Sequence, residues 1–407
     1  MRQDPASSER PRVSFLLSTF NRRDVVLHTL DRLYSCGLQR SDFEVLVVEN
    51  ASSDGTAEAV RLQFPSATLL RESVNRGPCA KNVGLSLARG EFIVFVDDDS
   101  SPEPGSVARM ISHFEADPRL GAAVFTITLP DGSRECSAYP DVCIGCGTGF
   151  RRAALSQVGG LPEDFFMAAE EYDLSLRLLD AGWRVRTFDD LHVTHLKSPA
   201  SRYPSRITRL DARNNTLLAM RYFPEPWRMR YALEWLDRYR LMAAANGQRA
   251  AFWAGAAAGV VRGLAAEHRP IRAEAFEQFS RIEQTYHRLL EITRREGHRR
   301  ILLVDFGKNI LAYRLAGERC ALEIVAIADS RLGGRGLRYR TTPIVTDAQA
   351  LSLPFDAAIV SNLSPVHARQ RSAAYRRLTS KPVIDLFESA RLEDAAGDAC
   401  IPPLAAA

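Results

Sequence analysis

A short apolar run that ends in three consecutive aspartates constrains the fold more than any other feature of the sequence. Residues 92–96 are apolar without interruption, and Asp97, Asp98 and Asp99 follow them. Such a run is typical of a strand buried on both faces of a parallel sheet, and these sheets bind ligands at the carboxyl ends of their strands. Because adjacent carboxylates repel one another, the triplet indicates a site for a divalent cation and a diphosphate; the alternative is an acidic surface turn. Alternation along an extended chain directs Asp97 and Asp99 one way and Asp98 the other.

The chain around this run alternates between strand-like and helical patterns. Apolar runs typical of strands lie at 13–19, 43–50, 67–72 and 92–96, and turn residues followed by amphipathic segments separate them. We therefore predict a parallel, doubly wound α/β sheet over residues 13–99, with right-handed crossovers. The patterns GxGxxG and GxxxxGK(S/T) are both missing from this region, which argues against dinucleotide redox chemistry and P-loop phosphoryl transfer.

Composition is that of an ordinary globular protein that acts on anionic molecules. The net charge is +4 and the hydrophobic content is 46%, so we expect an anionic small substrate or membrane surface and no nucleic acid. Residues 1–12 lack the apolar core of a signal peptide, and no apolar run is long enough to span a bilayer. The seven cysteines are scattered, which fits a reduced, cytoplasmic protein, and we interpret the CxxC pair Cys143 and Cys146 as structural rather than zinc-binding.

Acidic and histidine residues recur downstream of the aspartate triplet. Glu170, Glu171 and Asp173 begin a predicted helix. Acids in that position are favoured by the helix dipole, and a general base beside a metal site is the alternative interpretation. His192 and His195 follow a strand-like segment further along the chain.

Several ordered motifs between residues 13 and 224 together resemble an inverting family 2 glycosyltransferase with a GT-A fold. They are STFNR, VENASSDGT, NRGPCAKNVG, FVDDDS, GFRR, EEYDLSLR and a later histidine. The resemblance implies a doubly wound, mixed α/β sheet as the catalytic domain and a bound Mg²⁺ or Mn²⁺. It also implies transfer of a hexose or deoxyhexose from a nucleotide-diphosphate sugar to the hydroxyl of a glycan, a lipid-linked acceptor or a small molecule. The expected processes are cell-wall, polysaccharide or glycolipid synthesis and natural-product glycosylation.

The resemblance also implies roles for individual residues. Asp99 is the expected metal ligand, and His195 is the matching late histidine that completes the metal or diphosphate site or, alternatively, has a structural role. The residues expected to bind the nucleotide sugar are Thr19, Asn21, Glu49, Asp54, Asn75, Arg76, Asn82, Asp97 and Asp98. Lys81, Arg151 and Arg152 either contact phosphate or lie on the surface.

The general base is expected at the second acid of the family's Glu-Asp-x-Asp-Leu motif. That acid is Glu171 in this chain, so a glutamate replaces the commoner aspartate. Inversion by a single in-line displacement needs a base on the acceptor side, opposite the leaving diphosphate. Glu170 is the second candidate, and Asp173 is expected to cap or orient the helix.

The remainder of the chain divides into four predicted parts. Residues 1–12 are expected to be a flexible leader and residues 389–407 a tail. Residues 225–297 are predicted to be helical; a basic amphipathic helix among them either lies peripherally on the inner face of a membrane or packs on the catalytic domain. Residues 298–388 resemble a small Rossmann-like nucleotide- or CoA-binding domain of sugar-processing proteins. Because DFGKNI replaces the glycine-rich turn, a ligand near Asp329, a scaffold and a homo-oligomer contact all stay open.

Two other functions compete with sugar transfer. A sugar nucleotidylyltransferase needs a glycine-rich basic loop after the first strand, and STFNRRD contains no glycine. A catalytically degenerate binding or assembly subunit would lose its acidic residues, whereas this chain keeps the three aspartates, both glutamates and His195.

Overall fold

The computed structural model describes residues 10–198 and 203–388. The chain forms two compact units, divided between Phe279 and Ser280. The predicted tail, and the predicted leader up to residue 9, lie outside the described residues.

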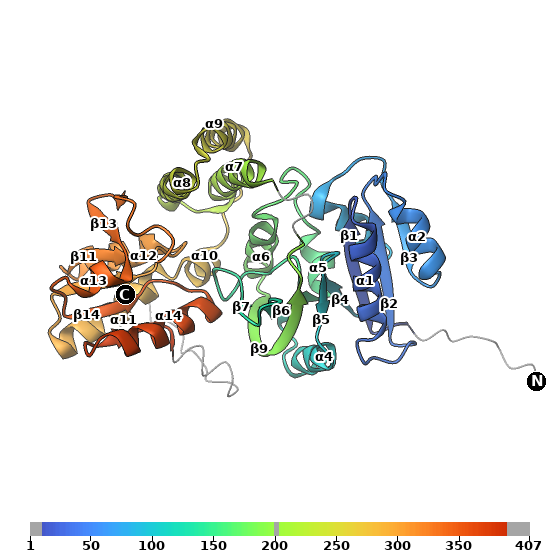
Figure 1. The fold of residues 1–407 in the computed structure, drawn as a ribbon, viewed down its shortest axis with the longest axis horizontal. Coiled ribbons are helices and arrows are strands. Elements are labelled where there is room, and N and C mark those ends of the chain that lie inside the picture. The colour runs from blue at the N-terminus through green and yellow to red at the C-terminus, as the bar shows by residue number, and fades with distance from the viewer. Residues whose placement is uncertain (1–9, 199–202, 389–407) are drawn as a thin grey trace, which may run out of the picture. The chain divides into compact units, whose positions relative to one another are not determined.

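The first unit is built on one large sheet, and the parallel strands predicted for its first part are confirmed. Its first four strands are β1 (Val13–Thr19), β2 (Phe43–Glu49), β3 (Thr68–Arg71) and β4 (Phe92–Phe95). They are parallel and lie in the order β3-β2-β1-β4, which Figure 1 shows. Six of the seven β1 residues and all four β4 residues are buried, as expected for central strands with both faces covered. The carboxyl ends of β1, β2 and β4 therefore meet at one edge of the sheet.

Helices connect these strands as the apolar spacing predicts. They are α1 (Arg23–Tyr34), α2 (Thr56–Gln63), the 3₁₀ turn η1 (Gly77–Ala80) and α3 (Lys81–Leu85). In α1 the buried side chains Val26, Leu30 and Leu33 lie three or four positions apart, so one stripe of the helix faces the sheet. Asp98 and its neighbours thus follow a strand that is central in the sheet.

The second half of the sheet reverses strand direction and makes it mixed. Its elements are β5 (Ser100–Pro102), α4 (Ser106–Ala116), β6 (Leu120–Thr128), β7 (Arg134–Glu135), β8 (Thr148–Arg151), α5 (Arg152–Val158), α6 (Glu170–Asp180) and β9 (Arg184–His195). Strand β8 pairs antiparallel with β4 and β6, and β5 pairs antiparallel with β9. The β5–β9 register places His195 opposite Ser100, one residue beyond the aspartate triplet. The predicted doubly wound mixed sheet is confirmed.

Helices complete the first unit after the sheet. They are α7 (Pro204–Tyr222), α8 (Trp227–Ala245), α9 (Arg249–Ala265) and α10 (Ala273–Ser280). Phe223 joins them, because its ring lies 5.0 Å from Tyr231, 5.4 Å from Trp235 and 5.1 Å from Phe276, measured between ring centroids. The aromatic cluster packs α8 and α10 around Phe223, and the predicted helical segment after the sheet is confirmed. Among the described helices, none combines the length and the apolar character needed to cross a bilayer.

The second unit contains its own α/β sheet. Its elements are α11 (Ile282–Glu296), β10 (Arg300–Val304), α12 (Ile310–Arg319), β11 (Glu323–Ala328), β12 (Arg338–Tyr339), β13 (Thr342–Val345), α13 (Asp347–Leu351), β14 (Ala357–Val360), α14 (Pro365–Leu378) and β15 (Val383–Ile384). The strand order is β12-β13-β11-β10-β14-β15, and only β12 is antiparallel to its neighbour. The predicted second, smaller α/β sheet is confirmed. Its likeness to a nucleotide- or CoA-binding domain and the predicted domain boundaries stay predictions.

Candidate active site

The aspartate triplet lies in a tight turn that begins where β4 ends. The Ser100 hydroxyl accepts a hydrogen bond from the Asp97 N–H at 2.8 Å and donates to the Cys146 carbonyl at 2.8 Å. The Ser100 N–H also donates to the Asp97 carbonyl at 3.1 Å. These bonds anchor the triplet to the turn that precedes β8. The turn leads directly into β5, so the triplet connects two strands of the same sheet, β4 and β5. Asp98 and Asp99 are buried, so the alternative of a solvated surface turn is wrong.

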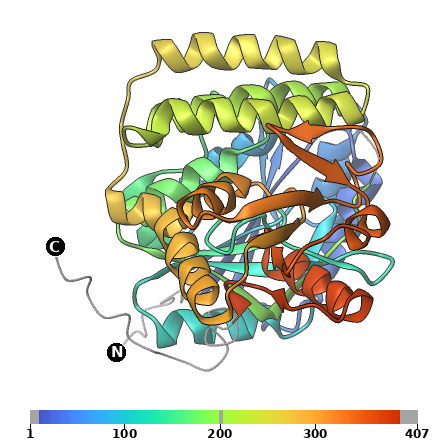
Figure 2. The same cartoon turned by 90° about the vertical axis from the view of Figure 1, so that its left-hand side faces the viewer.

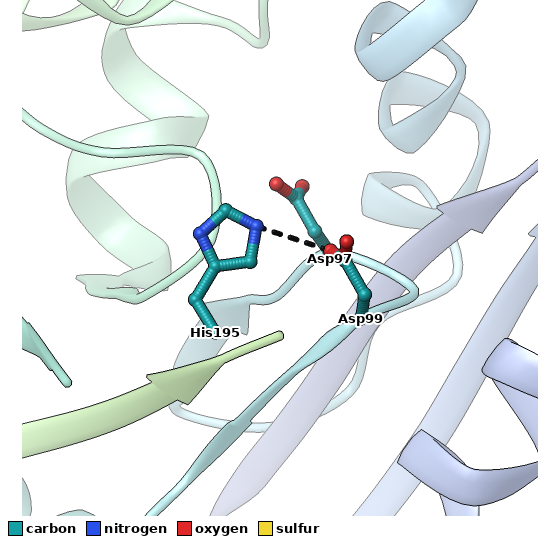
Figure 3. A group of neighbouring side chains, drawn as sticks. All are labelled: Asp97, Asp99 and His195. Carbon is teal, nitrogen blue, oxygen red and sulfur yellow. Dashed lines mark ion pairs between the residues drawn. The ribbon is translucent and has the colours of Figure 1, made fainter. Parts of the chain in front are cut away.

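Three side chains at this turn form a group that could hold a metal ion. One ligand atom from each of Asp97, Asp99 and His195 lies within 4.8 Å of the other two. Figure 3 shows His195, from the end of β9, facing the carboxylates, with the His195 Nε2–Asp99 Oδ1 ion pair of 3.1 Å drawn as a dashed line. Asp99 and His195 are buried, whereas the Asp97 side chain is 36% exposed. The cluster therefore opens to solvent on the Asp97 side.

The protonation of Asp99 is set by its neighbours. Burial raises the pKa of this carboxyl, but hydrogen bonds and positive charge from His195 and Arg22 outweigh it and hold the pKa below its ordinary value. The Ser198 N–H also donates to Asp99 Oδ2, at 2.9 Å. Asp99 is therefore ionised near neutral pH, as a metal ligand must be.

Asp98 points the other way, as strand alternation predicts. Its carboxylate accepts a hydrogen bond of 2.8 Å from the Thr19 hydroxyl, at the end of β1, and forms an ion pair with Arg22. Burial raises the Asp98 pKa to about 7, against the lowering effect of Arg22 and Thr19. The Thr29 hydroxyl of α1 also donates to the Asp98 carbonyl at 2.7 Å. Asp98 thus ties the triplet to β1 and α1.

Arg22 is a site residue that the sequence analysis missed. Its guanidinium contacts Asp98 with one terminal nitrogen and Asp99 with the other, the latter at 2.7 Å. Its single positive charge is shared between two of the three aspartates, and the side chain is only 13% exposed. The signal was the tandem Arg22–Arg23 after the first strand, but one sequence does not reveal which arginine turns inward. Arg23 turns outward and is half exposed.

Lys81 is buried beside Asp97, the one aspartate of the triplet that Arg22 does not contact. Its Nζ lies 3.0 Å from Asp97 Oδ1 and 3.1 Å from the Gly145 carbonyl, and the side chain is 1% exposed. The ammonium also lies 5.5 Å from the centroid of the Phe95 ring. The surface alternative for Lys81 is therefore wrong, and its charge acts on Asp97.

The two glutamates of α6 approach the same place. Glu170 and Glu171 line a small cavity together with Lys81 and Gly145. A Cβ placed on Gly145 would lie 3.3 Å from Glu171 Oε1 and 3.9 Å from Asp97 Oδ1, so both carboxylates face this glycine. Burial and the adjacent charge of Glu171 raise the Glu170 pKa well above its ordinary value. The aspartate cluster and the predicted base are therefore neighbours.

The loop that leads into the two glutamates of α6 has an unusual backbone conformation. Phe166, Ala168 and Ala169 have φ angles of 65°, 70° and 66°, which non-glycine residues rarely adopt. Asn214 of α7 secures this loop, because its Nδ2 donates to the carbonyls of Met167 at 2.9 Å and Ala168 at 2.7 Å. Asn214 is fully buried. The RNN string signalled this residue, but only the fold reveals what its amide contacts.

Residues predicted to bind the nucleotide connect the loops after β1 and β2. Asn21 Oδ1 accepts from the Ser53 N–H at 2.8 Å, and buried Glu49 accepts from the Ser52 N–H. Asp54 accepts from backbone N–H groups in the first turns of α1 and α2, at 3.0 and 3.1 Å. Burial raises the Asp54 pKa, but the hydrogen bond from the Thr56 hydroxyl and these backbone hydrogen bonds outweigh it and lower the value overall. The predicted residues thus share one edge of the sheet with Thr19 and the triplet.

Three further predicted residues lie on the segment around η1. Asn75 Oδ1 accepts from the Gly77 N–H at 2.8 Å, which shapes the turn. Arg76 pairs with Glu72 at 3.1 Å and is 44% exposed, so it is accessible to a ligand. Asn82 exchanges two hydrogen bonds with the backbone of Leu161, at 2.8 and 2.7 Å. This bracket connects α3 with the segment that leads to α6.

Other candidates from the sequence lie elsewhere. Arg151 donates to backbone carbonyls near the end of α4 and the start of β6, and Arg152 begins α5. Arg151 is therefore not the solvated surface residue of the alternative interpretation. Its contacts with backbone carbonyls do not support a role in phosphate binding. His192 is not part of the group formed by Asp97, Asp99 and His195. Cys143 and Cys146 are buried free thiols.

The comparisons with known proteins identify a family within the N-terminal part of the chain. Residues 14–139 match the family described as glycosyl transferase family 2. The succinoglycan biosynthesis protein ExoO of Rhizobium meliloti (strain 1021) is 31% identical over 114 residues, 28% of this chain and 32% of ExoO. The poly-beta-1,6-N-acetyl-D-glucosamine synthase of Staphylococcus epidermidis is 27% identical over 204 residues, 44% of this chain and 46% of the synthase. The chain thus spans between a third and a half of the length of these relatives.

Solved structures are similar over a larger share of the chain. The mannosyltransferase PcManGT from Pyrobaculum calidifontis, in complex with GDP-Man and Mn²⁺, has 25% sequence identity and a TM-score of 0.45 over 63% of this chain and 76% of that one. TarS 1-349 of S. aureus has 17% identity and a TM-score of 0.45 over 76% and 91%. The family match and the relatives together show that this chain carries a family 2 glycosyltransferase domain.

Proposed function

We propose that this protein is an inverting, metal-dependent glycosyltransferase, which moves a sugar from a nucleotide-diphosphate sugar to an acceptor hydroxyl. One observation carries the proposal: the group formed by Asp97, Asp99 and His195 lies beside Glu170 and Glu171, and the two aspartates belong to the segment that matches family 2. A cation site next to a carboxylate pair is what transfer from a diphosphate requires. The cation would neutralise the leaving diphosphate, and a carboxylate would remove the acceptor proton.

The donor set fits Mn²⁺ or Mg²⁺. Carboxylate oxygens suit both cations, and the imidazole of His195 suits Mn²⁺ better. Ligand atoms within 4.8 Å of one another can contact one ion without rearrangement of the backbone. We assign Asp97, Asp99 and His195 as the residues that would hold the cation. When bound there, it would offset the negative charge that develops on the departing diphosphate.

The nucleotide is expected along the edge formed by the ends of β1, β2 and β4. Buried Glu49 and Asp98 present acceptors for a ring N–H or a ribose hydroxyl, and the half-exposed Arg76 offers a cation for phosphate. The remaining proposed contacts come from loops at the same edge: Thr19, Asn21, Asp54, Asn75 and Asn82. Arg22 and Lys81 hold the aspartates in place from behind, through the ion pairs described above.

Glu171 is proposed as the general base. In a single in-line displacement, the acceptor O–H gives its proton to a Glu171 carboxylate oxygen as the new bond to the anomeric carbon forms. The bond from that carbon to the diphosphate breaks on the opposite side, and the diphosphate leaves with the electron pair, so the configuration inverts. Glu170 is the weaker candidate, because burial and the charge of Glu171 raise its pKa and favour the neutral form, which cannot take up the acceptor proton.

The donor and the acceptor are proposed as classes. The relatives' names include succinoglycan biosynthesis and poly-beta-1,6-N-acetyl-D-glucosamine synthesis. We infer a UDP-, dTDP- or GDP-sugar as donor and a cell-surface glycan, a lipid-linked glycan or a small molecule as acceptor. We place the reaction in the cytoplasm, where nucleotide sugars and reduced thiols are both present.

The experiment that tests this function is a donor panel. Purified full-length protein with Mn²⁺ is incubated with UDP-, dTDP- and GDP-sugars and with candidate acceptors, and the nucleoside diphosphate released is measured. We expect release from at least one donor, loss of release with EDTA, and recovery on adding Mn²⁺. Asp131→Asn, in an exposed turn, is the matched control for substitutions in the triplet. Tight donor binding with no release from any donor–acceptor pair would instead favour a catalytically degenerate binding subunit.

A further inference from the structure

Helix α9 packs against α7 through a stripe of glycines. Gly255, Gly259 and Gly263 recur every four residues and are buried. A Cβ on Gly255 would lie 2.2 Å from the Arg209 carbonyl, and one on Gly259 would lie 2.8 Å from the Arg213 carbonyl. The two helix backbones therefore approach closely, and this packing decides which face of α9 is turned outward.

The outer face of α9 is apolar and uncovered. Trp253 is 61% exposed, Val260 40%, Val261 67% and Leu264 67%. Three exposed alanines of the same helix, Ala250, Ala254 and Ala257, lie at helical spacing from these residues. Figure 2 shows α9, in yellow, on the far side of α7 and α8 from the first sheet. An exposed tryptophan and aliphatic side chains at helical spacing form a contiguous apolar strip, which marks an interaction surface. We call this strip the α9 face.

Positive charge surrounds the α9 face. Residues 204–265 contain ten arginines and only four acidic residues, whereas the whole chain has a net charge of +4. Arg249 and Arg262, the charged residues of α9, are exposed, as is Arg209 of α7. Burial and the charges of Arg262 and Arg209 lower the pKa of Arg213. The cations here thus repel one another, and an anionic surface would relieve that repulsion.

We propose that the α9 face docks on an anionic lipid surface, with Trp253, Val261 and Leu264 inserted among the headgroups and Arg249 and Arg262 against lipid phosphates. A helix of this composition binds a membrane by burying apolar area and by attraction to anionic lipids. A second copy is a poorer occupant, because pairing two α9 faces in either direction brings arginines together. The proposal goes beyond sugar transfer and stands whether or not the protein is an active transferase.

The test is flotation of the full-length protein with vesicles. Vesicles of phosphatidylcholine alone are compared with vesicles that contain about 30% phosphatidylglycerol, at low and high salt. We expect binding to the anionic vesicles at low salt, with a blue-shifted Trp253 emission that Trp253→Phe removes. The triple variant Trp253→Glu, Val261→Glu, Leu264→Glu should lose about tenfold or more of the bound fraction. Arg249→Gln with Arg262→Gln should lose less and only at low salt.

A matched control keeps the result specific. Leu62 on α2 is 82% exposed, so Leu62→Glu adds the same charge at an apolar surface position outside the α9 face and should leave binding unchanged. Equal binding of wild type and the triple variant would overturn the proposal. So would a wild-type dimer that the triple variant dissociates, with no vesicle binding, because a second copy would then cover the face. Failure of sugar transfer leaves these outcomes unaffected.

Discussion

The two sheets of this protein place acids at the same position and use them differently. In the first unit, Asp97 and Asp99 follow β4, and they meet His195 in a group that could hold a cation. In the second unit, Asp305 follows β10, and its carboxylate pairs with Arg371 at 2.6 Å. The first group keeps a partly exposed carboxylate, whereas the second is closed by protein side chains. Acids in both units have internal partners, so an acid after a buried strand indicates a ligand site only where further ligand atoms converge and one carboxylate stays partly exposed.

The network in the second unit extends across the ends of several strands. Arg371 also contacts Asp347 with two nitrogens, at 2.7 and 2.9 Å, and the Tyr375 hydroxyl donates to Asp347 at 2.8 Å. Asp329, which ends β11, accepts from the backbone N–H groups of Phe306, Arg331 and Leu332. The acid that the sequence suggested as a ribose contact is thus engaged in shaping loops. Neutralising an acid in the first unit should therefore reduce sugar transfer, whereas neutralising one in the second unit should leave transfer nearly unchanged.

The largest effect is expected for Asp99→Asn. This variant removes a cation ligand and should lower sugar transfer about 10³-fold or more, because a bound cation contributes several kcal/mol to the transition state. Asp329→Asn is the counterpart at the end of β11 and should keep transfer within about threefold of wild type. Steady-state release of nucleoside diphosphate measures both. Similar losses in the two variants would contradict the difference between the sheets.

The next effect is expected for Glu171→Gln. Removing a general base should lower kcat about 10²–10⁴-fold while donor binding is kept. Glu170→Gln should cost much less, because burial already favours the neutral form of Glu170. Turnover together with calorimetric donor affinity distinguishes the two glutamates. A larger kcat loss in Glu170→Gln would move the base to that residue.

A stability effect is expected for Arg371→Met in the second unit. The variant leaves the partly buried carboxylates of Asp305 and Asp347, 13% and 27% exposed, without their cation, which should cost about 3 kcal/mol of unfolding free energy. Chemical denaturation followed by circular dichroism measures it. The control is Arg377→Met, an exposed position on the same helix α14. Equal stability of the two variants would show that the network does not stabilise the unit.

A smaller, catalytic effect is expected for Asn214→Ala. The variant removes the hydrogen bonds that hold the loop before α6, at a cost of about 1–3 kcal/mol for the unsatisfied carbonyls. We expect kcat to fall while donor affinity changes little, because the loop carries the glutamates and not the nucleotide contacts. A loss of donor affinity with unchanged kcat would place this loop in the donor site instead.

The smallest effect concerns pH and Asp347. A hydrogen bond from Arg371 lowers the Asp347 pKa. Its ion pair therefore adds stability above the unfolded-state pKa of about 3.9 and loses it as the pH falls through the lower folded-state value. The difference in unfolding free energy between wild type and Asp347→Asn should be constant from pH 7 to 5 and shrink in more acid solution. A difference that grows toward low pH would have the wrong sign for this assignment.

Much of the first unit could be predicted from the sequence because local patterns determine it. Apolar runs of strand length and turn residues at their ends placed β1 to β4, and the acids at 97–99 and 170–171 indicated the candidate site. The inward position of Lys81 could not be predicted, because α3 is too short for its periodicity to reveal a buried face. Arg22 and Asn214 act through contacts across 76 and 46 residues of chain. Such long-range partners follow from the folded topology and not from spacing.

The ion-pair network at the strand ends of the second unit could not be predicted from the sequence either. The string DFGKNI indicated a doubtful ligand turn, and Asp305 has a φ of 75° there. Its partner Arg371 lies 66 positions away on α14, in a stretch with several arginines. Nothing in the sequence distinguishes the arginine that closes the strand ends from those that are solvated.

Binding of Mn²⁺ tests the central claim most directly. Isothermal titration of Mn²⁺ into full-length protein, in the presence of UDP or GDP, reports the cation site without requiring the acceptor. The account predicts one site that is lost in Asp99→Asn and in His195→Ala and is kept in Asp329→Asn. Unchanged Mn²⁺ binding in Asp99→Asn and His195→Ala would contradict it.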